Sequence, residues 1–318
     1  MNKLIKRIKK FISNNLANQY RVFLSNYHKR KNYDQIERII DKKYYKKMGR
    51  KIDWADPKSY TEKMNVSKVY GANAIKTELT DKVAVRVWVE RKIGKQYLIP
   101  IIGVYDSLKN VSFEELPEQF VIKCNHDSSS VTIVDSKKKL SKKDISRLIN
   151  KYDNYLLKRN FAFYGFEMHY AKISPKIIIE KNMGKNINDY KFLCFGGIPY
   201  YCWVDVDRFT NHKRNFYDMD WKLQPIKMGY ENYEGTIEKP KCFSEMVEIV
   251  QKLCSDFDGV RVDLYEVDQQ VYFGEMTFTT ENGLKRIDPV EWDYKFGQLW
   301  DFDNNLRKEI RNSQTKPD

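Results

Sequence analysis

The chain has 318 residues, 42% of them hydrophobic and 14% aromatic, so it is long enough for two or three lobes and apolar enough to build a core. The first 50 residues hold 15 Lys/Arg and 3 Asp/Glu and carry twelve of the fourteen excess positive charges, which excludes a uniformly basic nucleic-acid-binding protein. None of the five cysteines shows CxxC spacing, so a zinc site and a disulfide framework are not expected and a reduced, cytoplasmic protein is predicted. No apolar run reaches the roughly 18–20 residues of a membrane span.

The start of the chain shows the spacing of an amphipathic helix. One helical face is apolar, and the basic residues fall mostly on the other face. Such a helix either rests on an anionic membrane surface, through residues 1–30, or packs on the body of the protein with its basic face in water. The sequence leaves both open. The apolar residues are Leu4, Ile5, Ile8, Phe11, Ile12 and Leu16.

Helical patterns come next. Residues 58–95 predict helices that end at Gly94, because glycine is a common C-terminal stop. Residues 97–107 are apolar and rich in β-branched side chains, so a strand is expected there. Pro100 within it indicates an edge strand or a break.

The middle and the end of the chain read mainly as strands. Residues 119–135 predict two strands around a polar turn, followed by a helix at about 141–160 with Ser141 as its N-cap. The remaining expected elements are a buried strand at 176–180, a β region from 189 with a Gly-Gly turn at 196–197, an amphipathic helix at 244–257, and hairpin strands at 260–267 and 270–278.

Two carboxylates on the last pair of strands are candidate metal ligands. Asp263 and Glu275 both have apolar neighbours, and adjacent antiparallel strands bring such side chains together. Mg²⁺ bound to nucleotide phosphates uses one or two carboxylates of this kind. Burying them bare would cost several kcal/mol, so a metal or a basic partner is implied. Arg261 lies on the same strand face as Asp263, so a structural Arg–Asp pair is the other interpretation.

Lysines and arginines form the candidate anion-binding groups. Lys123 ends an apolar strand before the turn Asn-His-Asp-Ser-Ser-Ser, whose hydroxyl and N–H groups suit a phosphate, although a solvated lysine beside a polar turn has the same pattern. Asp189 and Lys191 share one strand face. A basic group some twenty residues further on is a candidate anion clamp or plain surface charge; it comprises Arg208, His212, Lys213 and Arg214.

Several other chemistries have no support. The sequence contains no Walker A, GxGxxG or HExxH motif, and no GxSxG that would make a nucleophile of the serines near His126. Cys124 follows Lys123 but has no identifiable base, so it reads as a buried strand cysteine. The Asp-Val-Asp at 205–207 is too short to indicate a nucleotide-sugar site.

Eight segments between residues 55 and 300 together resemble the ATP-grasp superfamily, in the teichuronopeptide-type (TupA-like) branch found among cell-surface polysaccharide genes. The signal is their order, since each alone is weak. The segments are SYTEKMN, TDKVAVR, YLIPIIGVYDS, FVIKCNHDSS, DYKFLCFGG, RNFYDMDW, VRVDLY and YFGEMTF.

The resemblance implies an α+β ATP-grasp fold, in which two α+β lobes hold ATP between them, preceded here by a helical basic N-terminal segment. The domains expected on this basis are a basic amphipathic segment at 1–50, a helical or α/β region at 51–115, the small lobe at 116–180, and the C-terminal lobe with the metal site at 181–318.

The resemblance also assigns roles. ATP would be bound by Lys123, by a mobile loop of Asn125, His126, Asp127, Ser128, Ser129 and Ser130, by a hinge of Glu180, Lys181, Asn182 and Met183, and by Asp189. Lys191, Arg208 and Arg214 would be catalytic, and Asp263, Glu275 and Thr277 would hold Mg²⁺. The chain departs from the family pattern in two places. Thr277 occupies a place where many relatives have asparagine, and Asn282 is the candidate substitute. Asp127 and Ser129 stand where the loop usually has glycine.

The activity that the resemblance implies is ATP-dependent ligation of a carboxylate to an amine through an acyl phosphate, with an amide, ADP and phosphate as products. The substrate would be a capsular or other cell-surface polysaccharide or its lipid-linked precursor, at the inner face of the plasma membrane. Two alternatives stay open: a phosphotransferase acting on a sugar of the same pathway, and a non-catalytic membrane- or polyanion-binding protein with a decayed ATP site.

Overall fold

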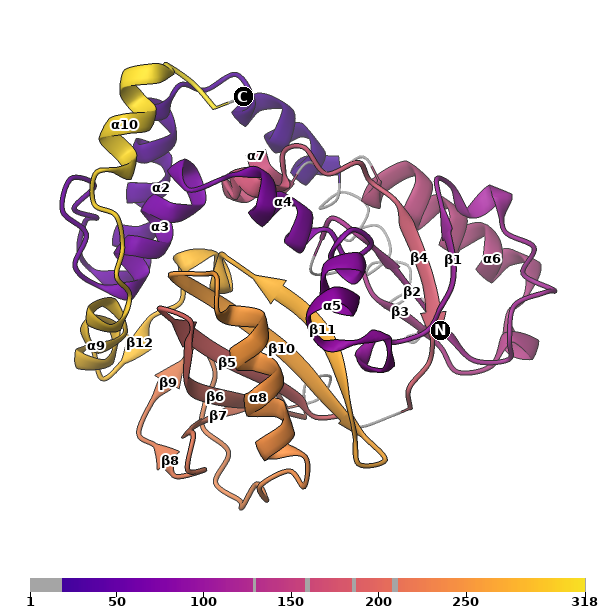
Figure 1. Cartoon of the computed structure of the whole chain (residues 1–318). Coiled ribbons are helices and arrows are strands. Elements are labelled where there is room, and N and C mark those ends of the chain that lie inside the picture. Colours follow the sequence, from indigo (N-terminus) through magenta and orange to yellow (C-terminus); the bar gives the residue numbers. More distant parts are fainter. Residues whose placement is uncertain (1–18, 128–129, 158–160, 185–186, 208–210, 318) are drawn as a thin grey trace, which may run out of the picture. The chain divides into compact units, whose positions relative to one another are not determined.

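The computed structural model of the chain describes residues 19–127, 130–157, 161–184, 187–207 and 211–317 (Figure 1). The apolar face predicted for residues 4–16 therefore lies outside the described residues. The chain divides into two compact units. The four domains expected from the sequence are a finer division and stay predictions. Unit 1 comprises Met1–Lys31, Asp81–Val83 and Pro100–Asn182, and unit 2 comprises Asn32–Thr80, Ala84–Ile99 and Met183–Asp318.

Unit 1 is built on a four-stranded antiparallel sheet in the order β1-β4-β2-β3. β1 lies at an edge of this sheet and Pro100 directly precedes it, as the proline predicted. Ser141 caps the following helix in a capping box with Asp144. The elements are β1 (Ile101–Tyr105), β2 (Phe120–Cys124), β3 (Thr132–Val134), β4 (Ile177–Lys181), α6 (Lys142–Ile149), a π-helical turn (Asn150–Leu156), α7 (Phe161–Gly165) and 3₁₀ turns at Leu108–Asn110, Lys137–Lys139 and Met168–Tyr170.

The core of unit 1 follows from strand alternation. Phe120, Ile122 and Cys124 point to the buried face of β2, while Val121 and Lys123 point away from it. The buried face packs with Ile177, Ile179, Tyr152 and Leu156 among others. The sequence predicted one helix over 141–160, but the α-helical part ends at Ile149 and the chain continues as the π-helical turn.

Unit 2 contains a six-stranded antiparallel sheet in the order β11-β10-β5-β6-β7-β8. Its strands are β5 (Asp189–Phe195), β6 (Ile198–Val206), β7 (Lys213–Asp218), β8 (Leu223–Gln224), β10 (Gly259–Val267) and β11 (Gln270–Thr277). Two short strands, β9 (Lys227–Met228) and β12 (Ile287–Asp288), form a separate two-stranded antiparallel sheet. Gly196 and Gly197, at φ 55° and 76°, form the predicted turn between β5 and β6. The predicted hairpin of β10 and β11 is also present.

The helices of unit 2 confirm the helical patterns of the sequence. Gly94 ends α5, with its N–H bonded to Glu90 O, as predicted. None of the helices among the described residues is long and apolar enough to cross a membrane. The helices are α2 (Tyr33–Met48), α3 (Tyr60–Tyr70), α4 (Ala74–Thr80), α5 (Val85–Ile93), α8 (Phe243–Cys254), α9 (Glu291–Leu299) and α10 (Leu306–Ser313), with 3₁₀ turns at Lys95–Tyr97 and Thr280–Gly283.

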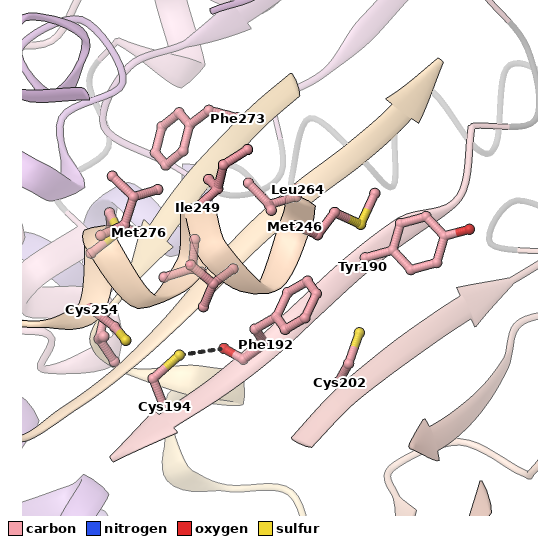
Figure 2. Close-up of a cluster of buried hydrophobic side chains, with 14 of the residues drawn as sticks. Tyr190, Phe192, Cys194, Cys202, Met246, Ile249, Cys254, Leu264, Phe273 and Met276 are labelled. Atoms are coloured by element: carbon pink, nitrogen blue, oxygen red, sulfur yellow. Dashed lines mark hydrogen bonds between the residues drawn. The ribbon is translucent and has the colours of Figure 1, made fainter. Parts of the chain in front are cut away.

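The two faces of the unit 2 sheet differ sharply in character. On one face, alternate residues of β5 and its neighbours pack against α8 and form a large apolar cluster (Figure 2). This cluster includes Tyr190, Phe192, Cys194, Cys202, Val262, Leu264, Met246 and Ile249. Burial raises the pKa of the Cys194 and Cys202 thiols, so neither is a thiolate nucleophile at neutral pH. Because the side chains alternate, the residues between them must point to the opposite face.

Helices α3 and α9 close one end of that opposite face. Tyr60 of α3 packs its ring against Phe195 of β5 and against Phe296 and Trp300. Gly297 permits the close approach, since a Cβ there would lie 2.1 Å from the carbonyl oxygen of Lys58.

Candidate functional site

Charged residues gather on the second face of the unit 2 sheet, in a row across four strands. Asp263 of β10 pairs in register with Lys191 of β5 on one side and Glu275 of β11 on the other, and Lys191 pairs with Trp203 of β6. Direct cross-strand partners share a face. The row therefore brings together Asp263, Glu275 and Lys191, which the sequence singled out separately.

A second row lies beside the first. Asp189 of β5 pairs with Asp205 of β6, which pairs with Arg214 of β7. The residues of both rows alternate with the apolar residues that face α8. We call the following eight side chains the charged cluster: Asp189, Lys191, Asp205, Arg214, Arg261, Asp263, Glu275 and Glu281.

Lys191 is buried among three carboxylates of the charged cluster. Its Nζ contacts Asp189 Oδ2 and lies 3.4 Å from Asp263 Oδ2 and 3.8 Å from Asp205 Oδ2. Lysine is a compact cation on a flexible stem. The position suits a group that neutralises charge on an anion arriving at this face.

Arg261 joins the two carboxylates predicted to bind metal. Its Nε lies 2.6 Å from Asp263 Oδ1, and its second terminal nitrogen lies 2.7 Å from Asp263 Oδ2 and 2.8 Å from Glu275 Oε1. Thr277 Oγ1 donates to the same Glu275 oxygen at 3.0 Å. Burial by itself would lower the pKa of Arg261, but the charges of Asp263 and Glu275 raise it above its ordinary value.

Arg214 holds the other side of the cluster. It donates to both oxygens of Asp205, from Nε at 2.6 Å and from a terminal nitrogen at 3.2 Å, and to Glu281 Oε1 at 3.0 Å. His212 Nε2 lies 3.0 Å from Asp205 Oδ1. Burial would raise the pKa of Asp205, yet the bonds and charge of Arg214 together with Lys191 hold it well below its usual value.

Trp203 lies near both arginines. The guanidinium carbons of Arg214 and Arg261 are 4.9 Å and 5.3 Å from its ring centroid. Both distances are within the range of a cation–π interaction. This fully buried ring therefore helps to fix the two guanidinium groups.

The charged cluster fits a magnesium ion in charge and ligand type. It contains five carboxylates and three cations, so a divalent cation would balance it when His212 is counted as neutral. Among the described residues, no three His, Cys, Asp or Glu side chains are arranged to hold a metal. Mg²⁺ commonly takes only one or two protein carboxylates and completes its shell with phosphate oxygens and water, so Asp263 and Glu275 have the ligand type that the ion prefers. Glu275 is the more accessible, with a side chain 26% exposed.

The unit 1 candidates lie along β2 and its neighbour β4: Lys123 and the polar turn are at the end of β2, and Glu180 and Lys181 pair with its first residues. Lys123 Nζ lies 2.6 Å from Glu180 Oε1 on the neighbouring strand β4, and both side chains are largely buried. Lys181 is exposed, and its N–H bonds to Pro100 O. Asn182 and Met183 are partly buried, and the chain passes from unit 1 to unit 2 between them, within the predicted hinge.

The polar turn after β2 is held by its own side chains. Asn125 donates to Asp81 Oδ1 and to Ser174 O and accepts from the N–H of Lys176. His126 Nε2 lies 3.2 Å from Leu156 O. Asp127 accepts from the N–H of Ser130, and the Ser130 hydroxyl accepts from the N–H of Cys124. Through these contacts, this turn of unit 1 is held in place by the side chains of Asn125, His126, Asp127 and Ser130.

Some residues predicted for the site are not among the described residues. Several residues that the structure places in the charged cluster or beside it were also not predicted as site residues. Ser128, Ser129 and Arg208 are not among the described residues. The prediction did not include Arg261, Asp205, Glu281 or Trp203 as site residues. Strand alternation puts Asp205 and Trp203 on one face of β6, and Arg261 and Asp263 on one face of β10. Glu281 had no such signal, because it lies in a turn with left-handed backbone (φ 50°) rather than in a strand.

Comparisons with known proteins bear on this arrangement. A family model described as TupA-like ATPgrasp matches residues 62–301. A search of curated proteins found no match. Two similar solved structures are a D-alanine–D-alanine ligase from Bacillus anthracis (17% identity, TM-score 0.43, 74% of this chain and 69% of that chain) and an N5-carboxyaminoimidazole synthetase from Staphylococcus aureus (12%, 0.36, 63% and 44%). The resemblance seen in the sequence is confirmed by the family model, which covers most of the chain: this protein belongs to the TupA-like ATP-grasp family and has its α+β ATP-grasp fold.

Proposed function

We propose that the protein is an ATP-dependent carboxylate–amine ligase. The observation that carries the proposal is the charged cluster on one face of the unit 2 sheet, in a member of an ATP-grasp family. A buried lysine, two buried arginines and a pair of cross-strand carboxylates are the groups that phosphoryl transfer uses to bind and neutralise charge.

The chemistry needs activation because a carboxylate is a poor acyl donor. A carboxylate oxygen of the substrate attacks the γ-phosphorus of ATP, the bond to the β–γ bridging oxygen breaks, and ADP leaves. The amine nitrogen then attacks the carbonyl carbon of the acyl phosphate, phosphate departs with the C–O bond electrons, and the nitrogen loses its proton to form the amide. Lys191 and Arg214 stabilise the transferred phosphoryl group by charge.

Magnesium has a limited and specific place in this proposal. Asp263 and Glu275 would hold it, and Thr277 would orient Glu275 through its hydroxyl. When bound, the ion would neutralise phosphate charge and polarise the γ-phosphoryl group. Arg261, which holds both carboxylates, would keep them positioned whether or not nucleotide is present.

Unit 1 would contribute the remaining contacts to ATP. Lys123 would give up its ion pair with Glu180 and bind phosphate oxygens of ATP instead. Residues 125–130 would cover the phosphates, and the backbone of residues 180–183 would meet the adenine. Asp189, which lies in unit 2, would bind the same nucleotide. The roles of residues 125–130 would rest on backbone N–H and hydroxyl groups, since the larger side chains already hold the turn.

The acceptor would be a cell-surface polysaccharide or its lipid-linked precursor, handled at the inner face of the plasma membrane. The resemblance to the teichuronopeptide-type branch found among cell-surface polysaccharide genes supports this pathway, and the excess positive charge of the N-terminal 50 residues supports an anionic surface nearby. An acidic sugar or an amino acid would supply the carboxylate.

Trapping the intermediate tests the reaction. The enzyme is incubated with Mg·ATP, hydroxylamine and a panel of uronic and amino acids, and ADP and hydroxamate are measured. Hydroxamate formed together with ADP supports the ligase. ADP with a phosphorylated sugar and no hydroxamate would overturn it in favour of phosphotransfer. Absence of any Mg·ATP binding by calorimetry, both without and with the acid panel, would favour the non-catalytic alternative.

A further inference from the structure

An aromatic face is exposed near the start of unit 1. Residues 19–28 are helical, and Tyr20, Phe23 and Tyr27 are 61%, 64% and 49% exposed. Their spacing of three and four residues puts the rings on one side of the helix. The rings of Phe23 and Tyr27 stack with centroids 6.5 Å apart. We call these three residues the aromatic face.

Another side of the same helix is fastened to the rest of unit 1. His28 is buried, its Nδ1 lies 2.8 Å from Phe163 O, and its ring is 4.7 Å from that of Phe166. Ser25 is buried beside it. The helix is thus anchored on one side, and its most apolar side is left in water. Three adjacent exposed rings are unusual on a surface without a partner.

The charge around the aromatic face indicates what covers it. The described residues that carry and follow the face, 19–31, contain four Lys/Arg and no Asp/Glu. Lys31 Nζ lies 4.1 Å from the Tyr27 ring centroid, so at least one of these cations borders the rings directly. Aromatic rings favour the boundary between lipid headgroups and acyl chains, and basic residues favour anionic headgroups.

We propose that the aromatic face docks this protein on an anionic lipid bilayer, with Tyr20, Phe23 and Tyr27 entering the headgroup boundary and the neighbouring basic residues Arg21, Lys29, Arg30 and Lys31 on the phosphates. A soluble polyanion would use the charge but not the rings, and a protein partner would not require a segment free of acidic residues. The inference deepens the proposed function, on which it rests for a lipid-linked acceptor, by naming the surface that contacts the membrane.

The test is binding of the full chain to vesicles in the absence of ATP. Co-sedimentation is measured with phosphatidylcholine vesicles and with vesicles containing 30% phosphatidylglycerol, at low and high salt. The variant is Tyr20→Ser/Phe23→Ser/Tyr27→Ser. Its matched control, Tyr45→Ser/Val87→Ser/Leu223→Ser, removes three side chains exposed to a similar extent (58%, 62% and 59%) elsewhere.

The expected result is binding that needs phosphatidylglycerol, weakens with salt, and drops about tenfold or more in the aromatic variant but not in the control. Equal binding of the aromatic variant and the wild type would overturn the proposal, as would equal binding to both kinds of vesicle. If the aromatic variant loses vesicle binding but still forms ADP with a soluble substrate, the lipid-binding surface and the ligase site are separate. Vesicle binding without any ATP turnover would count against the ligase alone.

Discussion

Arg261 and Asp263 stand two residues apart on β10 and form a bidentate ion pair, with both Asp263 oxygens within 2.7 Å of guanidinium nitrogens. Both side chains are buried. The same guanidinium reaches Glu275 on the next strand. One cation therefore holds two neighbouring carboxylates together. Removing it should lower the free energy of unfolding by more than breaking an ion pair on the surface.

Arg261→Met is expected to destabilise the fold by about 3–5 kcal/mol, because it leaves Asp263 without its bidentate partner and brings two negative charges face to face. Urea unfolding measures the change. The control is Arg286→Met, whose ion pair with Asp288 is largely exposed and should contribute at most about 1 kcal/mol. Similar losses in the two variants would show that the buried pair has no special role.

Asp205 gives a prediction for acid pH. Its pKa is lowered in the folded state, mainly by Arg214, so the ionised form stabilises the fold above the unfolded-state pKa of about 3.9. That contribution stays constant near neutral pH and is lost as the pH falls below about 4 toward the folded-state pKa.

The measurement is urea unfolding of His212→Gln and of His212→Gln/Asp205→Asn between pH 3 and pH 7. In a His212→Gln background, which removes the imidazole 3.0 Å from Asp205 Oδ1, the advantage of keeping Asp205 should be flat from pH 5 to pH 7 and shrink below pH 4. Asp220→Asn, at an exposed side chain, serves as the control and should leave stability within about 0.5 kcal/mol. An advantage that grows on acidification in this background would contradict the assignment.

Gly297 tests the close contact between α3 and α9. Gly→Ala in a helix normally stabilises it by up to about 1 kcal/mol, but here the added Cβ would meet the Lys58 carbonyl. Gly297→Ala should therefore destabilise by about 1–3 kcal/mol, as overpacking does. Thermal unfolding compares it with Gln298→Ala, the next residue, which is exposed. Stabilisation by Gly297→Ala would mean that the helices separate easily.

Strand alternation explains how much of the site was visible in the sequence. In β5 the polar residues Asp189 and Lys191 alternate with Tyr190 and Phe192, so their shared face could be read directly. Register could not. The pairing of Lys191 with Asp263 joins segments some seventy residues apart, and only the assembled sheet shows it.

The choice between an arginine and a metal as partner was also beyond the sequence. Arg261 and Asp263 share a strand face under either interpretation, and the structure shows the ion pair. Likewise, the residues Asn125 to Asp127 have the polarity of a phosphate-binding turn. Their side chains hold the backbone of that turn, a role that depends on the distant partners Asp81, Ser174 and Leu156.

Glu275 is the sharpest test of the proposed metal site. It is the more exposed of the two carboxylates, so Glu275→Gln should cost only about 1 kcal/mol of stability while removing a charge from the ion. We expect Mg²⁺-dependent ADP formation to fall by about a hundredfold or more. Glu291→Gln, at an exposed position of α9, should leave the rate unchanged.

Thermal unfolding with and without Mg·ATP provides a readout independent of turnover. Ligand at about 100 times its Kd adds roughly 2.7 kcal/mol to the stability of the wild type, and Glu275→Gln should lose most of this gain in the presence of Mg²⁺. Without the metal, the two proteins should respond alike to ATP, because the substitution acts through the ion. An undiminished Mg²⁺-dependent shift in the variant would remove Glu275 from the metal site and leave Asp263, held by Arg261, as the carboxylate to examine.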